Sequence, residues 1–152
     1  MILTKGLINM QNINKEKIVP YSAANMYSLV ADIEKYPDFV PYCTNSEIIS
    51  SFDSNVEASI EISYLGISKR LVTKNTITPN SQITMALVEG PIDMLCGCWS
   101  FIHINNTISK VSLEIELSDS NKALRMILPG LLDKASSQIM SSFIARAKKL
   151  YG

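Results

Sequence analysis

The sequence has no excess of either charge and no long apolar run. Its 152 residues carry fourteen basic and fourteen acidic side chains, so net charge gives no general reason to expect nucleic acid, and no DNA partner is expected. No apolar run approaches the ~20 residues that a membrane-spanning helix needs. The first residues also lack the apolar length and the cleavage site of a signal peptide. These absences favour a cytoplasmic protein, and we expect any association with the inner membrane to be peripheral.

Metal ligands and nucleophiles are also scarce. Three cysteines, an odd number, argue against a disulfide framework. Cys96 and Cys98 lie close together, but the chain has one histidine, His103, and no second close cysteine pair, so zinc is not expected. Cys43 has no histidine near it in the sequence, and no phosphate-binding loop or nucleophile elbow is present. We therefore predict no catalytic residue, no metal and no covalent cofactor.

The last thirty residues carry the strongest helical pattern. Apolar residues at steps of three or four form one stripe: Leu124, Leu128, Leu132, Ala135, Ile139, Phe143, Ala147 and Leu150. This spacing places them on one side of a helix. A helix over residues 122–151 would be roughly 45 Å long and would need a partner surface of similar length. We expect it to lie across a sheet.

Pro129-Gly130 interrupts this helical pattern. A proline inside a helix costs roughly 3 kcal/mol and a glycine about 1 more. Either the helix kinks at this point, or a short helix ends near Leu128 and a second one begins. Because Leu128 is a poor N-cap and the apolar stripe continues across the break, we predict a kink.

Between residues 47 and 117 the pattern changes to an alternation of period two. Residues 56–64 and 111–117 alternate apolar with polar side chains, which is typical of antiparallel strands with one dry face. Further runs at 67–78, 82–89 and 95–104 lie between them, and turn residues separate all of these runs. The connections are too short for parallel crossovers, so we predict an antiparallel meander.

Two short helices are predicted before this sheet. Residues 13–19 alternate weakly, as an edge strand does, and Ser22 is a good N-cap for a helix that follows. The segment Tyr36-Pro-Asp-Phe-Val-Pro-Tyr-Cys43 holds two prolines, so it is expected to form a rigid apolar loop after a short helical turn. The predicted fold class is α+β: a curved antiparallel sheet wrapped around the long C-terminal helix. We expect one domain over residues 11–152 and a disordered leader over residues 1–10.

Several of these segments resemble a known family. The segment from Val19 to Val30, the Tyr36–Cys43 loop, Glu89-Gly-Pro91, Trp99-Ser-Phe101 and the tail Arg146-Ala-Lys-Lys-Leu-Tyr-Gly152 together resemble the coenzyme Q-binding protein and ribosome association toxin A family. That family lies within the START-like, helix-grip, polyketide cyclase-type superfamily. The resemblance covers about residues 11–152, and Pro129-Gly130 departs from what is expected in the family's long helix.

The resemblance implies a pocket that holds ubiquinone or a similar isoprenoid lipid as a bound ligand. It leaves two cellular roles open: support of respiratory quinone function, which is our main hypothesis, and binding of the large ribosomal subunit to block subunit joining. A polyketide cyclase-like enzyme is a third alternative. A transient contact with a membrane surface is a further expectation.

We place the candidate pocket at the proline-rich loop, one strand and the long helix. The predicted ligand-binding residues are Tyr36, Phe39, Val40, Pro41, Trp99, Phe101, Leu128, Leu131 and Leu132. The loop could be a lid over the pocket or a packing plug between helix and sheet, with about even support for each. Trp99 could stack on a ligand ring, but a role in the core has the stronger prior.

Basic residues supply a candidate contact with RNA. Lys69, Arg70 and Lys74 lie close together on one predicted strand, and Lys134, Arg146, Lys148 and Lys149 lie on the last helix. Ordinary surface charge is the favoured interpretation. The alternative is a footprint for ribosomal RNA or an anionic membrane, carried by Lys69, Arg70 and Lys74.

Overall fold

The computed structural model describes residues 11–152, apart from the side chains of Leu124, Arg125, Ile127, Leu128 and Pro129. In chain order, the strands are β1 (Gln11–Val19), β2 (Cys43–Phe52), β3 (Asn55–Tyr64), β4 (Ile67–Thr78), β5 (Gln82–Glu89), β6 (Met94–Asn105) and β7 (Ile108–Ser118). They form one seven-stranded antiparallel sheet in the order β1-β7-β6-β5-β4-β3-β2. The sheet is thus a meander from β2 to β7, with β1 added at the far edge.

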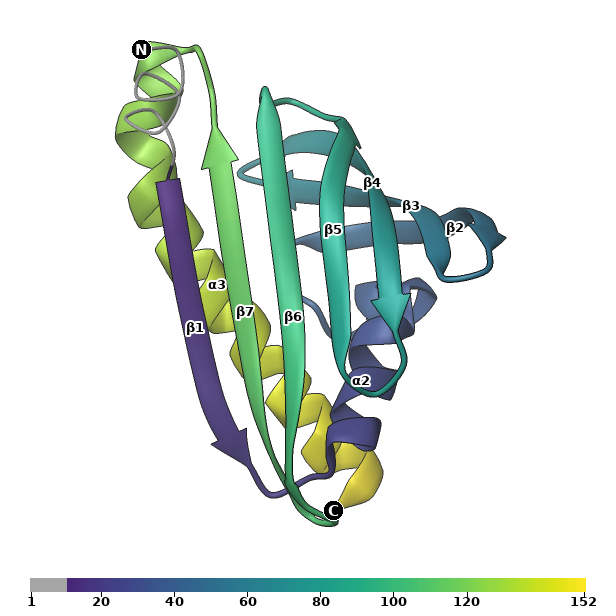
Figure 1. The fold of residues 1–152 in the computed structure, drawn as a ribbon. Helices are drawn as coiled ribbons and strands as arrows, with labels where there is room; N and C mark the ends of the chain where they lie inside the picture. The colour runs from purple at the N-terminus through teal and green to yellow at the C-terminus, as the bar shows by residue number, and fades with distance from the viewer. Residues whose placement is uncertain (1–10) are drawn as a thin grey trace, which may run out of the picture.

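The sheet twists strongly along its width, and the long helix α3 (Lys122–Tyr151) lies across one of its faces (Figure 1). Strands β1, β7, β6 and β5 run roughly side by side in this view, whereas β2 and β3 turn across them. Right-handed twist of this kind accumulates from strand to strand. The inner face of the sheet consequently curves around the helix instead of meeting it along a flat plane.

Two short helices fill the space between the sheet and the second half of α3. Helix α2 (Ala23–Ala31) begins at Ser22, whose side chain accepts a hydrogen bond of 3.1 Å from the backbone N–H of Asn25. A 3-10 helix, η1 (Ile33–Asp38), follows and contains Pro37. Figure 1 shows α2 next to the C-terminal part of α3, at one end of the sheet.

The main core lies at this same end. Met140, Phe143 and Ala147 of α3 are buried against Met26, Leu29 and Val30 of α2 and against inward side chains of β6 and β7. Phe143 is 1% exposed and lies at the centre of this contact. The second half of α3 is therefore the part that fastens the helix to the sheet.

The α+β helix-grip fold predicted from the sequence is confirmed. Helix α3 is continuous across Pro129-Gly130, so the alternative of two separate helices is wrong, while the kink itself stays a prediction. The disordered leader was predicted for residues 1–10, which lie outside the described residues.

Candidate functional site: an apolar cavity beside the β3–β4 hairpin

An apolar cavity of about 570 Å³ lies between the β3–β4 hairpin, the β5–β6 loop and the first half of α3. We call it the hairpin cavity. The residues that line it are Ile62, Tyr64, Ile67, Lys69, Leu71, Pro91, Ile92 and Leu131. A volume of this size lies in the range of small-molecule sites in proteins.

Alternation along the two strands of the hairpin builds the cavity wall. Ile62 pairs with Lys69 and Tyr64 pairs with Ile67, so these side chains point to the same face of the sheet. Pro91 and Ile92 come from the loop between β5 and β6, and Leu131 comes from α3. Three separate segments of the chain therefore converge on one apolar space.

An aromatic cluster around Phe143 fills the space between the sheet and the second half of α3. The ring of Phe143 lies 5.4 Å from that of Tyr36, 5.1 Å from Phe39 and 5.2 Å from Trp99, measured between ring centroids. These edge-to-face contacts are the arrangement that aromatic pairs prefer. The cluster packs the second half of α3 tightly, and the hairpin cavity is found beside the first half.

Tyr42 links the proline-rich loop to the hairpin and to the helix. Its hydroxyl donates a hydrogen bond of 2.7 Å to Oε1 of Gln138 in α3, and its ring lies 5.3 Å from that of Tyr64. Its carbonyl accepts a hydrogen bond of 2.8 Å from the backbone N–H of Ser63. These contacts hold Tyr64, a cavity residue, at a fixed distance from α3.

The described lining has little polarity. Lys69 carries the single charge among the described side chains that line the cavity, and the Tyr64 hydroxyl is the other polar group. Such a lining favours an apolar ligand, because burial of apolar surface contributes roughly 25 cal/mol per Å². An ammonium and a hydroxyl together can donate hydrogen bonds to an acceptor oxygen at one end of that ligand.

The structure places the predicted ligand-binding residues in different surroundings. Leu131 lines the hairpin cavity. Trp99 and Phe101 are each 4% exposed in the core, where their rings stack at 6.3 Å. Leu132 is half-buried but is not among the cavity residues. The side chain of Leu128 lies outside the described ones.

The loop residues Tyr36, Phe39, Val40 and Pro41 lie apart from the hairpin cavity. Tyr36, Phe39 and Val40 are half-buried against the core. The guanidinium carbon of Arg146 lies 5.1 Å from the centre of the Phe39 ring. Phe39 and Pro41 also border a shallow surface hollow over α3. This geometry favours the interpretation of the loop as a packing plug over its interpretation as a lid. The role of the four loop residues in ligand binding stays a prediction.

Most residues of the cavity were missed at the sequence level. Ile62, Tyr64, Ile67 and Leu71 were recognised as strand residues but not as a binding surface. Their alternate positions along the two strands were a usable signal, because this spacing places all four side chains on one face of a single hairpin. The missing information was that the first half of α3 leaves part of this face uncovered.

The three basic residues predicted to contact RNA do not form one cluster. Lys69 points into the hairpin cavity with Ile62, whereas Arg70 and Lys74 lie on the opposite face of β4. There Arg70 is paired in register with Glu61 and Lys74 with Glu57. The neighbouring carboxylates reduce the positive potential that these two residues offer to a phosphate.

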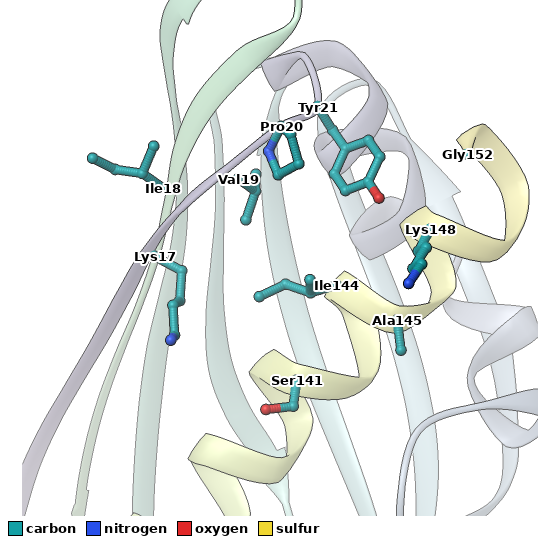
Figure 2. A pocket seen from close by; sticks show the side chains of 10 residues that line it. All are labelled: Lys17, Ile18, Val19, Pro20, Tyr21, Ser141, Ile144, Ala145, Lys148 and Gly152. Atoms are coloured by element: carbon teal, nitrogen blue, oxygen red, sulfur yellow. The ribbon is translucent and has the colours of Figure 1, made fainter.

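A second hollow, the seam groove, runs between the end of β1 and the last turns of α3 (Figure 2). It has a volume of about 710 Å³, and Val19, Pro20 and Ile144 contribute apolar surface. Lys17 on β1 and Lys148 on α3 lie on the two sides of the groove. No acidic side chain is among the described residues that line it. The seam groove, with Lys17 and Lys148, is therefore more basic than the hairpin cavity, where Lys69 is the charged residue of the described lining.

Thiol and metal chemistry find little support in the described part of the chain. Burial raises the pKa of the Cys43 thiol, while a hydrogen bond with the backbone of Asn45 acts in the opposite direction. A raised pKa lowers the thiolate population and so the nucleophilicity. No cluster of three potential metal ligands occurs among residues 11–152 as described. Within the same range, no helix combines the length and apolarity needed to cross a membrane.

Comparison with known proteins identifies the family. Residues 19–144 match the family described as polyketide cyclase / dehydrase and lipid transport. The ribosome association toxin RatA of Escherichia coli is 34% identical, over 99% of this chain and 98% of that protein. A mitochondrial coenzyme Q-binding protein homologue of Xenopus laevis is 24% identical, over 91% of this chain and 59% of that protein.

A solved structure supports the fold independently. The Zhui aromatase/cyclase from a Streptomyces species superimposes with a TM-score of 0.85 at 14% identity, over 92% of this chain and 94% of that one. At this identity the likeness concerns the fold alone. With the full-length match to RatA, it shows that the chain belongs to the RatA and coenzyme Q-binding family, within the START-like polyketide cyclase superfamily.

Proposed function

We propose that the protein binds an apolar lipid, with an isoprenoid quinone as the best candidate, in the hairpin cavity. The observation that carries this proposal is the apolar lining contributed by three segments of the chain, with Lys69 and the Tyr64 hydroxyl as polar groups. The tail would replace water against Ile62, Ile67, Leu71 and Leu131. A carbonyl oxygen of the quinone ring would accept a hydrogen bond from the Lys69 ammonium.

A thermal shift with a short-tailed ubiquinone tests this proposal. Bound ligand stabilises the folded state by about 2.7 kcal/mol at a hundredfold excess over its dissociation constant. We expect the Ile92→Trp variant, which adds bulk at the loop that borders the cavity, to lose most of this shift while folding normally. The matched control is Ile102→Trp, at an exposed position of β6. An equal shift in all three proteins would place the ligand elsewhere.

For the cellular role, we propose ribosome association ahead of quinone delivery. The support is the full-length 34% identity to RatA, against 24% identity over only 59% of the coenzyme Q-binding relative. Of the basic surfaces, the seam groove fits RNA better than β4 does. Lys17 and Lys148 are exposed, and neither has an ion pair among the described residues. Arg70 and Lys74 instead face Glu61 and Glu57.

Sedimentation with purified large ribosomal subunits tests this role. Binding should weaken as salt rises, because each phosphate contact releases condensed counterions. We expect Lys17→Glu with Lys148→Glu to abolish co-sedimentation at low salt, and Arg70→Glu with Lys74→Glu to reduce it much less. A wild-type protein that stays at the top of the gradient at low salt would contradict ribosome association. If only the Arg70→Glu, Lys74→Glu variant loses binding, the ribosome contact lies on β4 and not at the seam groove.

We propose a binding protein in preference to an enzyme. The described lining offers one ammonium and one phenol and otherwise apolar side chains, which suits retention of a ligand better than acid–base chemistry. The cyclase alternative has the fold-level likeness to the Zhui enzyme in its favour. Incubation of the protein with a linear polyketide chain, followed by mass spectrometry, would reveal cyclised product only if this alternative holds.

A further inference from the structure

The turn between β3 and β4 exposes apolar side chains at the edge of the hairpin cavity. Leu65 is 83% exposed and Ile67 is 61% exposed, next to Tyr64, which is 41% exposed. Across the cavity, Leu131 is 42% exposed, so the lining itself is partly open to solvent. Scattered single apolar residues on a surface need no explanation, but a contiguous group around an apolar opening does.

The backbone of this turn makes the leucine more unusual. Leu65 and Gly66 occupy the two turn positions with φ of 49° and 79°, the pattern of a type I′ hairpin. Asn-Gly is the preferred sequence for that turn, because asparagine adopts the left-handed region at a lower cost than leucine. In the turn after β2 and in the turn after β4, the residues with positive φ are Asp53 and Asn80. A leucine at this position therefore strains the backbone, and its exposed side chain gains no packing in return.

We propose that the β3–β4 turn, with Leu65 at its tip, is a docking surface for an anionic lipid bilayer. This inference rests on the proposed binding of an apolar lipid in the hairpin cavity. The tip would enter the boundary between headgroups and acyl chains, and the cavity opening would then face the membrane. The lipid ligand could pass between bilayer and cavity without crossing water.

Charge near the tip favours a bilayer over another apolar partner. Lys69 lies three residues after Gly66 on the cavity face of β4, and no acidic side chain is among the described residues that line the cavity beside it. Arg70 lies on the opposite face across from Glu61, so Lys69 carries the net positive charge near the tip. Basic residues beside an inserted apolar tip are attracted to anionic headgroups. A second copy of the chain would instead have to accommodate two like-charged tips against each other.

Flotation with vesicles of equal parts phosphatidylglycerol and phosphatidylethanolamine tests the proposal. The informative variant is Leu65→Asn, which restores the preferred turn residue. We expect about tenfold weaker vesicle binding, because one buried leucine side chain is lost from the bilayer. The same variant should melt about 2–4 °C higher without lipid, because the strained leucine is removed. A gain in stability together with a loss of docking is not what damage to the fold would produce.

The matched control is Phe52→Asn. Phe52 is 78% exposed beside the β2–β3 turn, about 30 Å away along the ten residues of β3, and its variant should bind vesicles as the wild type does. Equal losses in both variants, or no loss with Leu65→Asn, would overturn the proposal. If the wild type dimerises without lipid and Leu65→Asn is monomeric, the tip is a contact between copies and the proposal is wrong.

A short-tailed ubiquinone added from solution separates this inference from the proposed function. We expect wild type and Leu65→Asn to bind it equally well, because Leu65 does not line the cavity. Equal binding from solution without a difference in vesicle docking contradicts the docking surface alone. Vesicle docking without quinone binding contradicts the proposed ligand and leaves the docking surface standing.

Discussion

A few aromatic residues decide where the space between helix and sheet is filled. Trp99 is 4% exposed and lies in contact with Phe101 and Phe143, so its indole is a structural element of the core. This position differs from the pocket wall that the sequence allowed for it. Large aromatic side chains bury more surface than most others, so their truncation lowers the stability of the fold strongly.

Trp99→Ala should therefore lower the free energy of unfolding by about 3–5 kcal/mol, as large-to-small changes of buried aromatics do. Urea unfolding monitored by circular dichroism gives this value. Ile102→Ala on the same strand, where the side chain is 49% exposed, serves as the control and should change stability little. A cost below about 1 kcal/mol for Trp99→Ala would mean that the indole is not packed as described.

Tyr36 makes stability depend on alkaline pH. Its hydroxyl donates a hydrogen bond to the carbonyl of Val30, and burial raises the pKa of Tyr36 above that of a free tyrosine, with Cys43 and Asp32 adding to the effect. Because the folded pKa is higher, the folded state keeps a proton that the unfolded state loses above about pH 10. The stabilising contribution is complete below that pH and is lost as pH rises through the folded pKa.

The unfolding free energy should thus fall above about pH 10, by up to about 1.4 kcal/mol per pH unit from this residue. Tyr36→Phe should show a shallower decline, together with a constant loss for the missing hydrogen bond. Urea unfolding across the alkaline range measures both slopes. Identical slopes in the two proteins would show that another group, such as Cys43, controls the decline.

At the scale of elements, α3 has two halves with different tasks. The half with Met140, Phe143 and Ala147 is buried in the core, whereas Leu131 in the first half borders the hairpin cavity. Gly130 lies in the first half, directly before Leu131, and a Cβ atom built there would meet nothing within 4 Å. The glycine is therefore not required by close packing against the described atoms.

Gly130→Ala should stabilise the protein by about 0.5–1 kcal/mol, since glycine in a helix interior is less favourable than alanine by that amount. Thermal and urea unfolding both report the change. Destabilisation would indicate that the Pro129-Gly130 step carries a bend that alanine does not tolerate.

The sequence predicted these elements well for physical reasons. Strand alternation and turn residues are local, so β3 to β7 occur close to the predicted ranges, and the Ser22 cap marks the start of α2. The assignment of residues to surfaces was less successful. Lys69, Arg70 and Lys74 are neighbours in sequence, but strand parity divides them between two faces.

At the scale of the whole molecule, the space between helix and sheet is filled around Phe143 and left open beside the β3–β4 hairpin. The aromatic cluster around Phe143 and the short helices fill one part of this space, and the β3–β4 hairpin borders the cavity in the other. The location of this cavity could not be predicted, because it depends on the twist of the sheet relative to α3. Of the predicted ligand-binding residues whose side chains the structure describes, Leu131 is the one in the cavity lining.

A site-resolved measurement tests the central claim, that the hairpin cavity holds an apolar lipid. Isoleucine methyl groups report on both hollows: Ile62, Ile67 and Ile92 line the hairpin cavity, Ile144 lines the seam groove, and Ile83 is buried elsewhere. In a methyl NMR titration with a short-tailed ubiquinone, our account predicts that the signals of Ile62, Ile67 and Ile92 shift together and saturably, while those of Ile144 and Ile83 stay in place. Shifts confined to Ile144, or no shift at any of these methyls, would contradict it.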